Sequence, residues 1–331
     1  MKKLHRAFVI LAGAALACLV FASAALAQDR ILKFAIPFPE VEYMPLYAAQ
    51  QNGYFRAERL SIEVFAMSSG DKITLALASG SVDIANYTPD WFVRAIEKGG
   101  PIKIVAGSSN VPVYSLVTTA DIKSYADLKK KRVAVSAVKA SDAYLVRKMF
   151  SARGLQPADY DLIQVGSSGE RAAALKAGSV SATLLIPPYD SVVVAEGYKR
   201  LDVSTSTVTH YTWLAHAVRE DWARANKATL VGFIRAWIKG TRWVYDPKNK
   251  EAAIRILMRE LKIEDRFARI AYELYFESKT ETVAKDGKID LVGLQNLIDA
   301  IAEQGDIGPP VPKAAKYIDN TYWDEALKSL K

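Results

Sequence analysis

Cysteine and histidine are scarce in this chain of 331 residues, which has one cysteine, Cys18, and three histidines. Cys18 lies in an N-terminal stretch that we expect to be removed. The mature protein would then have no cysteine, so disulfides and thiol chemistry are excluded. The sequence also lacks a metal-binding motif, a nucleophile elbow and a phosphate-binding loop. The commonest catalytic centres are therefore not expected.

The N-terminus has the order of a secretory signal peptide. A short basic region at residues 2–6 precedes an uncharged, apolar stretch from Ala7 to Ala24, and Ala25-Leu26-Ala27 supplies a small-x-small cleavage site. We expect a signal peptide at residues 1–27, cleavage after Ala27 and export to the periplasm. The alternative is an uncleaved membrane anchor, because the apolar run approaches the ~20 residues that span a bilayer.

Positive charge is in modest excess and is spread along the chain. The chain has 44 lysines and arginines against 36 acids, a net charge of +8, and removal of three leader cations leaves +5. Neither a basic block nor a second long apolar stretch follows the leader. We therefore expect no nucleic-acid partner and no further membrane segment.

Short β-type runs alternate with helical patterns through the first 200 residues, which favours βα units and a largely parallel sheet. The expected strands are residues 31–36, 61–65, 102–106, 132–136, 162–165 and 182–186. The expected helices between them are residues 45–52, 72–79, 90–98, 141–152 and 169–177.

An internal repeat with an offset of 98 residues indicates two similar lobes. Ala76-Leu77-x-x-Gly80-Ser81-Val82 recurs as Ala174-Leu175-x-x-Gly178-Ser179-Val180, and Pro89 recurs as Pro187. An aromatic residue follows each proline by two positions, Trp91 in the first copy and Tyr189 in the second. Each copy reads as a helix closed by glycine, a strand and a proline turn that begins the next helix.

The predicted fold class is therefore α/β, with two βα lobes joined by two crossing strands. We expect residues 28–112 and 213–331 to form lobe 1 and residues 113–212 to form lobe 2. The crossing strands are expected at residues 110–119 and 204–213, where they would act as a hinge. Further helices are expected to pack on lobe 1, at residues 230–245, 250–261, 265–276 and 291–304.

Several motifs resemble periplasmic binding proteins of the nitrate/sulfonate/taurine ABC-importer family. They are Pro45-Leu46-Tyr47-x-Ala49-x-x-x-Gly53-Tyr54-Phe55, residues 76–84 and Ile122-Lys123-Ser124-x-x-Asp127-Leu128. The tail, with Gly287-x-Ile289-Asp290 and Tyr317-Ile318-Asp319, looks more like the thiamine-pyrimidine-precursor branch. Three positions depart from the family pattern: Arg59 and Lys130 stand at usual glycines, and Ser181 replaces an acid.

The resemblance implies a two-lobed, type II-like binding-protein fold and a protein that is not an enzyme. Such a protein captures a small organic ligand between its lobes, as a monomer without a cofactor, and passes it to an ABC permease in the inner membrane. We expect an anion such as a sulfonate or an aromatic carboxylate. The alternatives are a pyrimidine or thiamine precursor, an enzyme on the same fold, and a ligand sensor.

Ligands of parallel α/β sheets meet the carboxyl ends of strands beside helix N-termini, which favour anions. Serine-rich loops precede several expected helices, and Lys139 is the leading cation for an anionic ligand; the alternatives are ordinary helix caps and a solvent-facing lysine. Tyrosines could stack on a flat ring, whereas Trp91 is expected in the core. The candidate ligand-binding residues are Phe38, Tyr43, Met44, Ser68, Ser69, Asn86, Tyr87, Thr88, Lys139, Ser141, Ser167, Ser168 and Tyr189.

Overall fold

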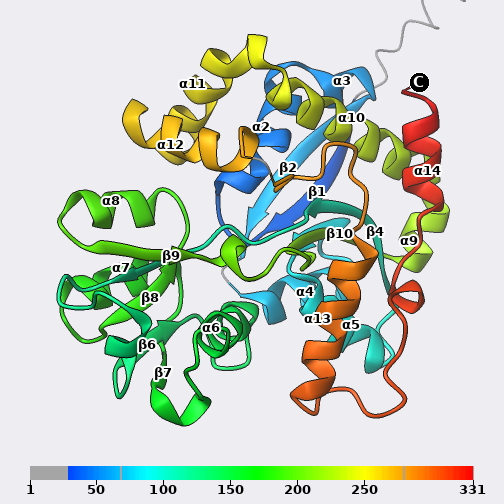
Figure 1. The fold of residues 1–331 in the computed structure, drawn as a ribbon. Helices are drawn as coiled ribbons and strands as arrows, with labels where there is room; N and C mark the ends of the chain where they lie inside the picture. The colour runs from blue at the N-terminus through cyan, green and yellow to red at the C-terminus, as the bar shows by residue number, and fades with distance from the viewer. Residues whose placement is uncertain (1–28, 68, 279, 331) are drawn as a thin grey trace, which may run out of the picture.

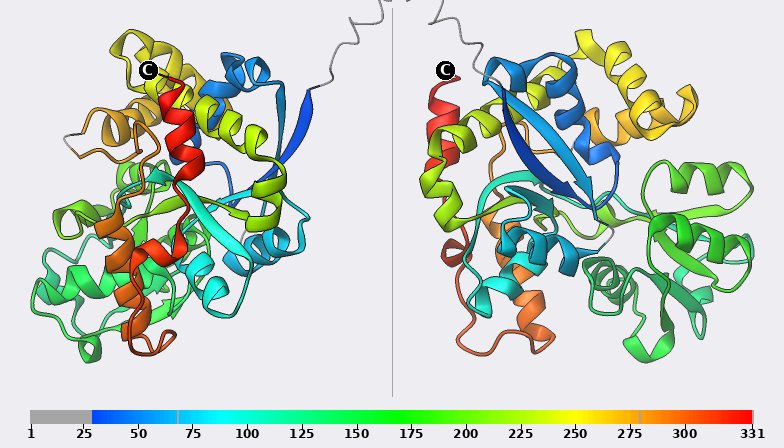
Figure 2. Two further views of the ribbon diagram at one scale, coloured as in Figure 1. Left: turned by 90° about the vertical axis from the view of Figure 1, so that its right-hand side faces the viewer. Right: turned by 180° about the vertical axis from the view of Figure 1, so that it is seen from behind.

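The computed structural model describes residues 29–67, 69–278 and 280–330. The expected leader and Ser68 lie outside the described residues. Two separate five-stranded sheets, each covered by helices, form two lobes side by side (Figures 1 and 2). The predicted two-lobed α/β fold is confirmed.

The first sheet has the strand order β2-β1-β3-β10-β4. Its strands are β1 (Arg30–Ile36), β2 (Leu60–Ala66), β3 (Ile84–Tyr87), β4 (Ile102–Ser109) and β10 (Leu214–Arg219). β1 pairs in parallel with β2 and β3, whereas β10 runs antiparallel between β3 and β4. The carboxyl ends of β1, β2 and β3 therefore lie at one edge of this sheet.

The second sheet has the order β7-β6-β8-β5-β9, which matches the first sheet strand for strand. Its strands are β5 (Ser115–Thr118), β6 (Arg132–Val135), β7 (Asp161–Gln164), β8 (Ala182–Leu185) and β9 (Lys199–Val203). β5 is antiparallel to both of its neighbours. In each sheet the antiparallel fourth strand is thus contributed by chain that has just crossed from the other lobe.

The repeat seen in the sequence is confirmed in the structure. Helices α4 (Gly70–Ser79) and α7 (Ser168–Lys176) begin 98 residues apart, and so do strands β3 and β8. Gly80 and Gly178, which follow the two helices, have φ angles of 80° and 69°. This left-handed conformation closes a helix at little cost when the residue is glycine.

The second crossing differs from the prediction of a strand. Residues 204–206 form a short 3-10 helix, Ser204–Ser206, and irregular chain follows as far as β10. The Ser204 hydroxyl donates to the Pro112 carbonyl at 2.7 Å and accepts from the Tyr114 N–H at 2.9 Å. The Ser204 side chain therefore links the two crossings by hydrogen bonds, at a position where the β-branched sequence predicted a strand. Every strand before residue 113 or after residue 212 belongs to the first sheet, and every strand between them belongs to the second. The exact lobe boundaries stay a prediction.

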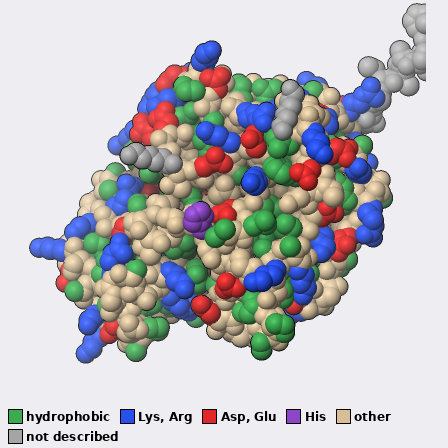
Figure 3. Space-filling view, turned by 45° about the vertical axis from the view of Figure 1, so that its right-hand side comes forward, with side chains coloured by type: hydrophobic (Ala, Val, Ile, Leu, Met, Phe, Trp, Pro, Cys, Tyr) green, Lys and Arg blue, Asp and Glu red, His purple; other side chains and the backbone are tan. Residues whose placement is uncertain are grey.

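The C-terminal helices pack on the first lobe, as predicted. They are α9 (Glu220–Ala225), α10 (Lys227–Tyr245), α11 (Lys250–Leu261), α12 (Asp265–Phe276), α13 (Leu291–Glu303) and α14 (Thr321–Lys328). α10 covers α2 (Met44–Gln51), and α13 packs on α5 (Pro89–Glu97). α12 also reaches across to α8 (Tyr189–Ala195) of the second lobe. On the face shown in Figure 3, basic and acidic side chains are interspersed.

Arg59 and Lys130, the two residues at usual glycine positions, keep a glycine-like backbone. Their φ angles are 56° and 59°, in the left-handed region. A side chain in this conformation costs about 1–2 kcal/mol because its Cβ crowds the carbonyl oxygen. Both turns therefore have the backbone conformation that glycine adopts most readily.

Candidate ligand-binding site

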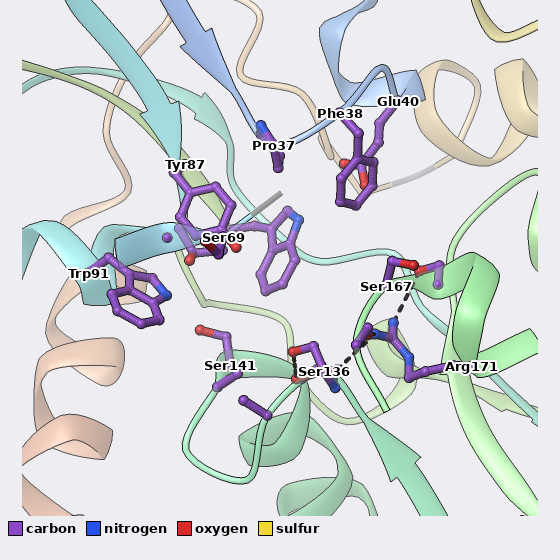
Figure 4. A pocket seen from close by; sticks show the side chains of 18 of the residues that line it. Pro37, Phe38, Glu40, Ser69, Tyr87, Trp91, Ser136, Ser141, Ser167 and Arg171 are labelled. Atoms are coloured by element: carbon purple, nitrogen blue, oxygen red, sulfur yellow. Dashed lines mark hydrogen bonds and ion pairs between the residues drawn. The ribbon is translucent and has the colours of Figure 1, made fainter. Parts of the chain in front are cut away.

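A cavity of about 550 Å³ lies between the lobes. The first lobe contributes the loop after β1, the start of α4 and the end of β3, and the second contributes the loops after β6 and β7. Figure 4 shows Phe38, Glu40 and Tyr87 on one side of it and Ser136, Ser141 and Arg171 on the other. The cavity thus lies at the carboxyl ends of the parallel strands, where α/β sheets bind ligands.

Seven of the candidate residues line this cavity and come from both lobes. They are Phe38, Ser69, Tyr87, Thr88, Ser141, Ser167 and Ser168. Ser69 and Ser167, which the repeat relates, are on opposite lobes, so the structure brings the two serine loops together. Their contact with a ligand remains a proposal.

Three candidates lie in the core instead of the cavity. Tyr43, Met44 and Asn86 are fully buried, and none is part of the cavity lining. The Tyr43 hydroxyl donates to the Asn86 carbonyl at 3.4 Å, and the Asn86 amide nitrogen lies 3.1 Å from Nδ1 of His216. Burial lowers the pKa of His216 to about 3, so this histidine is neutral.

Lys139 points away from the cavity. Its side chain is 71% exposed, and its ammonium lies 3.3 Å from the Asp306 carboxylate. Asp306 also pairs with Arg94, which in turn pairs with Asp90 at 2.7 Å. Lys139 belongs to the second lobe, whereas Asp306 follows α13 on the first, so this pair bridges the lobes.

Aromatic side chains that were not among the sequence candidates form much of the cavity wall. Trp91, Tyr114 and Trp213 all line it, and Trp91 is half-buried here although the sequence favoured a core position. Gly70 makes room for Trp91, because a Cβ at residue 70 would lie within about 2.5 Å of the indole. Tyr114 and Trp213 lie in the two crossings, so the signal that could have identified them was their place in the hinge.

Arg171 is the one cation in the cavity lining among the described residues, and its guanidinium is held by protein groups. It is 2% exposed and donates to the Leu184 carbonyl from two nitrogens, at 3.1 and 3.2 Å. It also donates to the Gly166 carbonyl and to the Ser168 hydroxyl, and it lies 3.5 Å from the Asp142 carboxylate. Because these contacts engage all three nitrogens, the group braces the loop and offers little to a ligand anion.

The Asp142 carboxylate is equally well supported. It accepts from the N–H and the hydroxyl of Ser136, both at 2.7 Å, and from the Ala143 N–H at 3.0 Å. With the Arg171 ion pair beside it, this acid is fully compensated where it lies buried.

Glu40 is different, because its carboxyl group faces the cavity without a partner. The residue is 8% exposed, and it accepts no hydrogen bond and forms no ion pair with any side chain that the structure describes. Burial raises the pKa of Glu40 well above its usual value, and the neighbouring Glu42 raises it further, while Arg171 opposes the shift. The carboxyl oxygens of Glu40 keep access to the cavity, unlike Oε2 of Glu42, so an N–H donor of a ligand can reach them.

Glu42 lies behind Glu40 in the protein interior. The Tyr275 hydroxyl donates to Oε1 of Glu42 at 2.6 Å, while Oε2 has no partner in the described part of the chain. Burial raises the pKa of Glu42 to about 7. Two neighbouring acids therefore lie at different depths, Glu40 at the cavity wall and Glu42 in the core.

The two histidines beyond the leader have different surroundings, one buried and one exposed. His216 is in the core against Trp237, with 4.3 Å between the ring centroids, and His210 is exposed beside Asp290. No cluster of three potential metal ligands occurs in residues 29–330 as far as they are described. Nor does any described helix have the length and apolar character needed to cross a membrane.

Comparison with known proteins decides the family. The model of the family described as "NMT1/THI5 like" matches residues 40–250, which is most of the chain. The chain belongs to the NMT1/THI5-like family. The match contains the loop with Glu40 and Glu42, both crossings and the whole second sheet. It covers every residue that lines the cavity except Pro37 and Phe38, which lie just before its first residue.

Two named relatives resemble the chain over about two thirds of its length. The chain is 29% identical over 231 residues to the formylaminopyrimidine-binding protein of Halalkalibacterium halodurans, which covers 67% of each chain. It is 26% identical over 245 residues to a putative binding protein, YtlA, of Bacillus subtilis, over 70% of this chain and 72% of the relative.

Solved structures with the same fold include binding proteins and an enzyme. The nitrate-binding protein NrtA of Synechocystis superposes with a TM-score of 0.73 and 17% identity, over 92% of this chain and 89% of that one. The aliphatic sulphonate-binding protein SsuA of Escherichia coli gives 0.70 and 17%, over 90% and 99%. The desulfurization enzyme DSZB gives 0.67 and 16%, over 91% and 99%, so the fold alone does not decide between binding and catalysis.

Proposed function

We propose that this member of the NMT1/THI5-like family is an exported solute-binding protein that delivers its ligand to an ABC importer. The ligand is a small, flat, nitrogen-containing ring with N–H donors, held between the lobes and released unchanged. The observation that carries this proposal is the carboxyl group of Glu40, which lines the cavity and has no hydrogen-bond or ion-pair partner among the described side chains.

The electrostatics of the lining favour a neutral or cationic ring over an anion. Glu40, Asp71, Asp142 and Glu170 bring four carboxyl groups to the lining, against the single guanidinium of Arg171. Since Arg171 already contacts four protein groups, an anion would find no free buried cation. An amino group or a ring N–H would instead donate to Glu40. Of the two ligand classes expected from the sequence, the pyrimidine class is thus the better fit to this lining.

The aromatic wall suits a flat ligand. Phe38, Tyr87 and Trp91 come from the first lobe, and Tyr114 and Trp213 come from the crossings. Aromatic rings stack or meet edge to face on a planar ligand and exclude water around it. A ring that touches both lobes also favours the closed arrangement of the two lobes, which is how a ligand shifts such an equilibrium.

The names of the relatives support binding of this kind. One relative is a formylaminopyrimidine-binding protein, and SsuA is described as periplasmic. Together with the secretory pattern at residues 1–27, these names support a periplasmic protein that works beside an inner-membrane permease. We propose that it acts as a monomer, without a cofactor and without turnover of its ligand.

A thermal-shift screen with matched charge classes tests the proposal. The probes are 4-aminopyrimidine, cytosine, benzoate, benzenesulfonate and nitrate, followed by chromatography of the recovered probe. We expect stabilisation by an aminopyrimidine, since a ligand at 100 times its Kd adds about 2.7 kcal/mol, and recovery of the probe unchanged. Stabilisation by the anions alone, or conversion of the bound probe, would contradict the proposal.

A further inference from the structure

A second cavity of about 450 Å³ opens beside the first. Phe38, Glu40, Ser167 and Ser168 line both cavities and so form their shared wall. The remaining lining is Pro39, Gly169, Pro187, Pro188, Tyr189, Glu260, Leu261 and Lys262. The second cavity therefore lies between the start of α8 in the second lobe and the end of α11 on the first.

The two cavities have related aromatic residues. Trp91 of the first cavity and Tyr189 of the second are 98 residues apart, the offset of the repeat. Each ring lies against a glycine at the start of the helix before it: a Cβ at Gly70 would lie within about 2.5 Å of the Trp91 indole, and a Cβ at Gly169 would lie 3.3 Å from the Tyr189 ring. The same local device, a ring over the first turn of a helix, thus faces each cavity.

Tyr189 is also unusually available. Its side chain is 40% exposed, although most large apolar side chains of this lobe are buried. Phe38, Leu261 and three prolines surround the same space, with Glu260 and Lys262 at the end of α11. Glu40, Ser167, Ser168, Glu260 and Lys262 add polar groups to these apolar walls. Sites for flat organic molecules combine apolar surfaces with polar groups that orient the molecule.

We propose that the second cavity is a subsite for a flat, apolar substituent on the ring that Glu40 holds. The solute would then be a two-part molecule, a nitrogen-containing ring joined to an aromatic or conjugated group. This inference rests on the proposed function, because it takes the ring at Glu40 as given. Since Phe38 and Glu40 line both cavities, a molecule whose N–H groups face Glu40 reaches the second cavity with its substituent.

Calorimetric titration with matched probes tests the subsite. The parent probe is 4-amino-2-methylpyrimidine, and the extended probes carry a benzyl group on N4, on C5 or in place of the methyl group. At least one extended probe should bind about tenfold more tightly than the parent. Tyr189→Ala and Leu261→Ala should each abolish most of that gain and leave the affinity for the parent unchanged, while Tyr189→Phe should retain it.

Leu75→Ala is the control, because Leu75 is 71% exposed and lines neither cavity. It should change neither affinity. The subsite is refuted if no extended probe binds more tightly than the parent, or if Tyr189→Ala weakens both kinds of probe equally. If the parent itself fails to bind, the proposed function fails and the subsite with it, so the parent titration separates the two failures.

Discussion

The rings of Tyr114 and Trp213 meet edge to face at an interplanar angle of 89°, with 5.4 Å between their centroids. Each ring comes from one of the two crossings between the lobes, and both line the cavity. The Ser204 hydroxyl also accepts a hydrogen bond from the Tyr114 N–H, so the same contact region joins the crossings. A ligand that fills the cavity would therefore touch both crossings.

Loss of the Trp213 ring should weaken ligand binding. An aromatic pair contributes about 0.5–1.5 kcal/mol beyond its buried area, and the ligand would lose its own contact as well. Trp213→Ala should lower the affinity for an aminopyrimidine by at least tenfold in calorimetry, whereas Trp213→Phe should lower it by less than threefold. Trp323→Phe, outside the cavity, is the control. If the Trp213→Ala protein folds and its affinity is unchanged, the Trp213 ring does not contribute to ligand binding.

The Lys139–Asp306 pair should stabilise the closed arrangement of the lobes. It joins the second lobe to the first, but it is partly exposed, and exposed ion pairs contribute about 0.2–1 kcal/mol. Lys139→Ala should therefore weaken ligand binding two- to fivefold at low salt, and the difference should shrink at 0.5 M salt as the charges are screened.

Lys131→Ala is a matched control, because Lys131 pairs with Asp121 at 3.8 Å within one lobe. It should leave the affinity unchanged. The sequence-based role of Lys139, direct contact with an anionic ligand, predicts a different result: selective loss of benzoate or sulfonate binding. That outcome would restore the anion-binding role and contradict the bridging one.

Stability should fall as the pH rises through the range in which Glu42 ionises. Burial raises the pKa of Glu42 to about 7 from 4.5, so between these values the folded protein holds a proton that the unfolded chain has lost. This shift corresponds to roughly 3 kcal/mol lost by pH 8. Glu42→Gln removes the titrating group. In urea unfolding, its stability relative to the natural chain should therefore be higher at pH 8 than at pH 5.

The exposed Glu63 supplies the control, since Glu63→Gln should give the same difference from the natural chain at both pH values. If the stability difference between Glu42→Gln and the natural chain is also the same at both pH values, Glu42 is not the group that makes the stability depend on pH.

The fold could be predicted from the sequence further than the site could. The repeat from Ala76 to Val82 and its copy already contained the two lobes, because each local pattern of helix, glycine and strand is complete in the sequence. β10 could not be found in this way: its strand contains alanines and a buried histidine, His216, and depends on β3 and β4 for its pairing. Ser69 and Ser167, which the sequence places at helix starts for the same local reason, line the cavity, and their contact with a ligand stays a prediction.

Electrostatic roles in the cavity depend on contacts between distant parts of the chain. Lys139 was the leading candidate to bind an anionic ligand, but it pairs with Asp306, 167 residues later, and does not line the cavity. Arg171 looks like an ordinary helical arginine in the sequence, and only the fold brings Leu184 and Asp142 to it. From the sequence, Glu40 or Glu42 could accept from an amino group or a ring N–H, or both could be solvated; only the fold shows that Glu40 lines the cavity and that Glu42 lies in the core.

A glycine at residue 130 should stabilise the protein. Lys130 has a φ of 59°, and relief of about 1–2 kcal/mol of left-handed strain exceeds the 0.5–1 kcal/mol that glycine costs in chain entropy. Lys130→Gly should raise the Tm by about 1–3 °C. The neighbouring Lys129, with φ −60°, is the control, and Lys129→Gly should lower the Tm. Equal effects at the two positions would contradict the strain argument.

The most direct test of the account is calorimetry and thermal unfolding of Glu40→Gln, with Glu63→Gln as its control, because Glu63 is exposed and lines neither cavity. Hydrogen bonds to charged groups contribute about 1.5–3 kcal/mol, so Glu40→Gln should weaken aminopyrimidine binding by at least tenfold. The empty variant should also gain stability relative to the natural chain as the pH rises above about 4.5, because burial raises the pKa of Glu40 and an amide has no charged form. Unchanged affinity together with unchanged or lower stability would contradict the assignment of Glu40 as the group that holds the ligand.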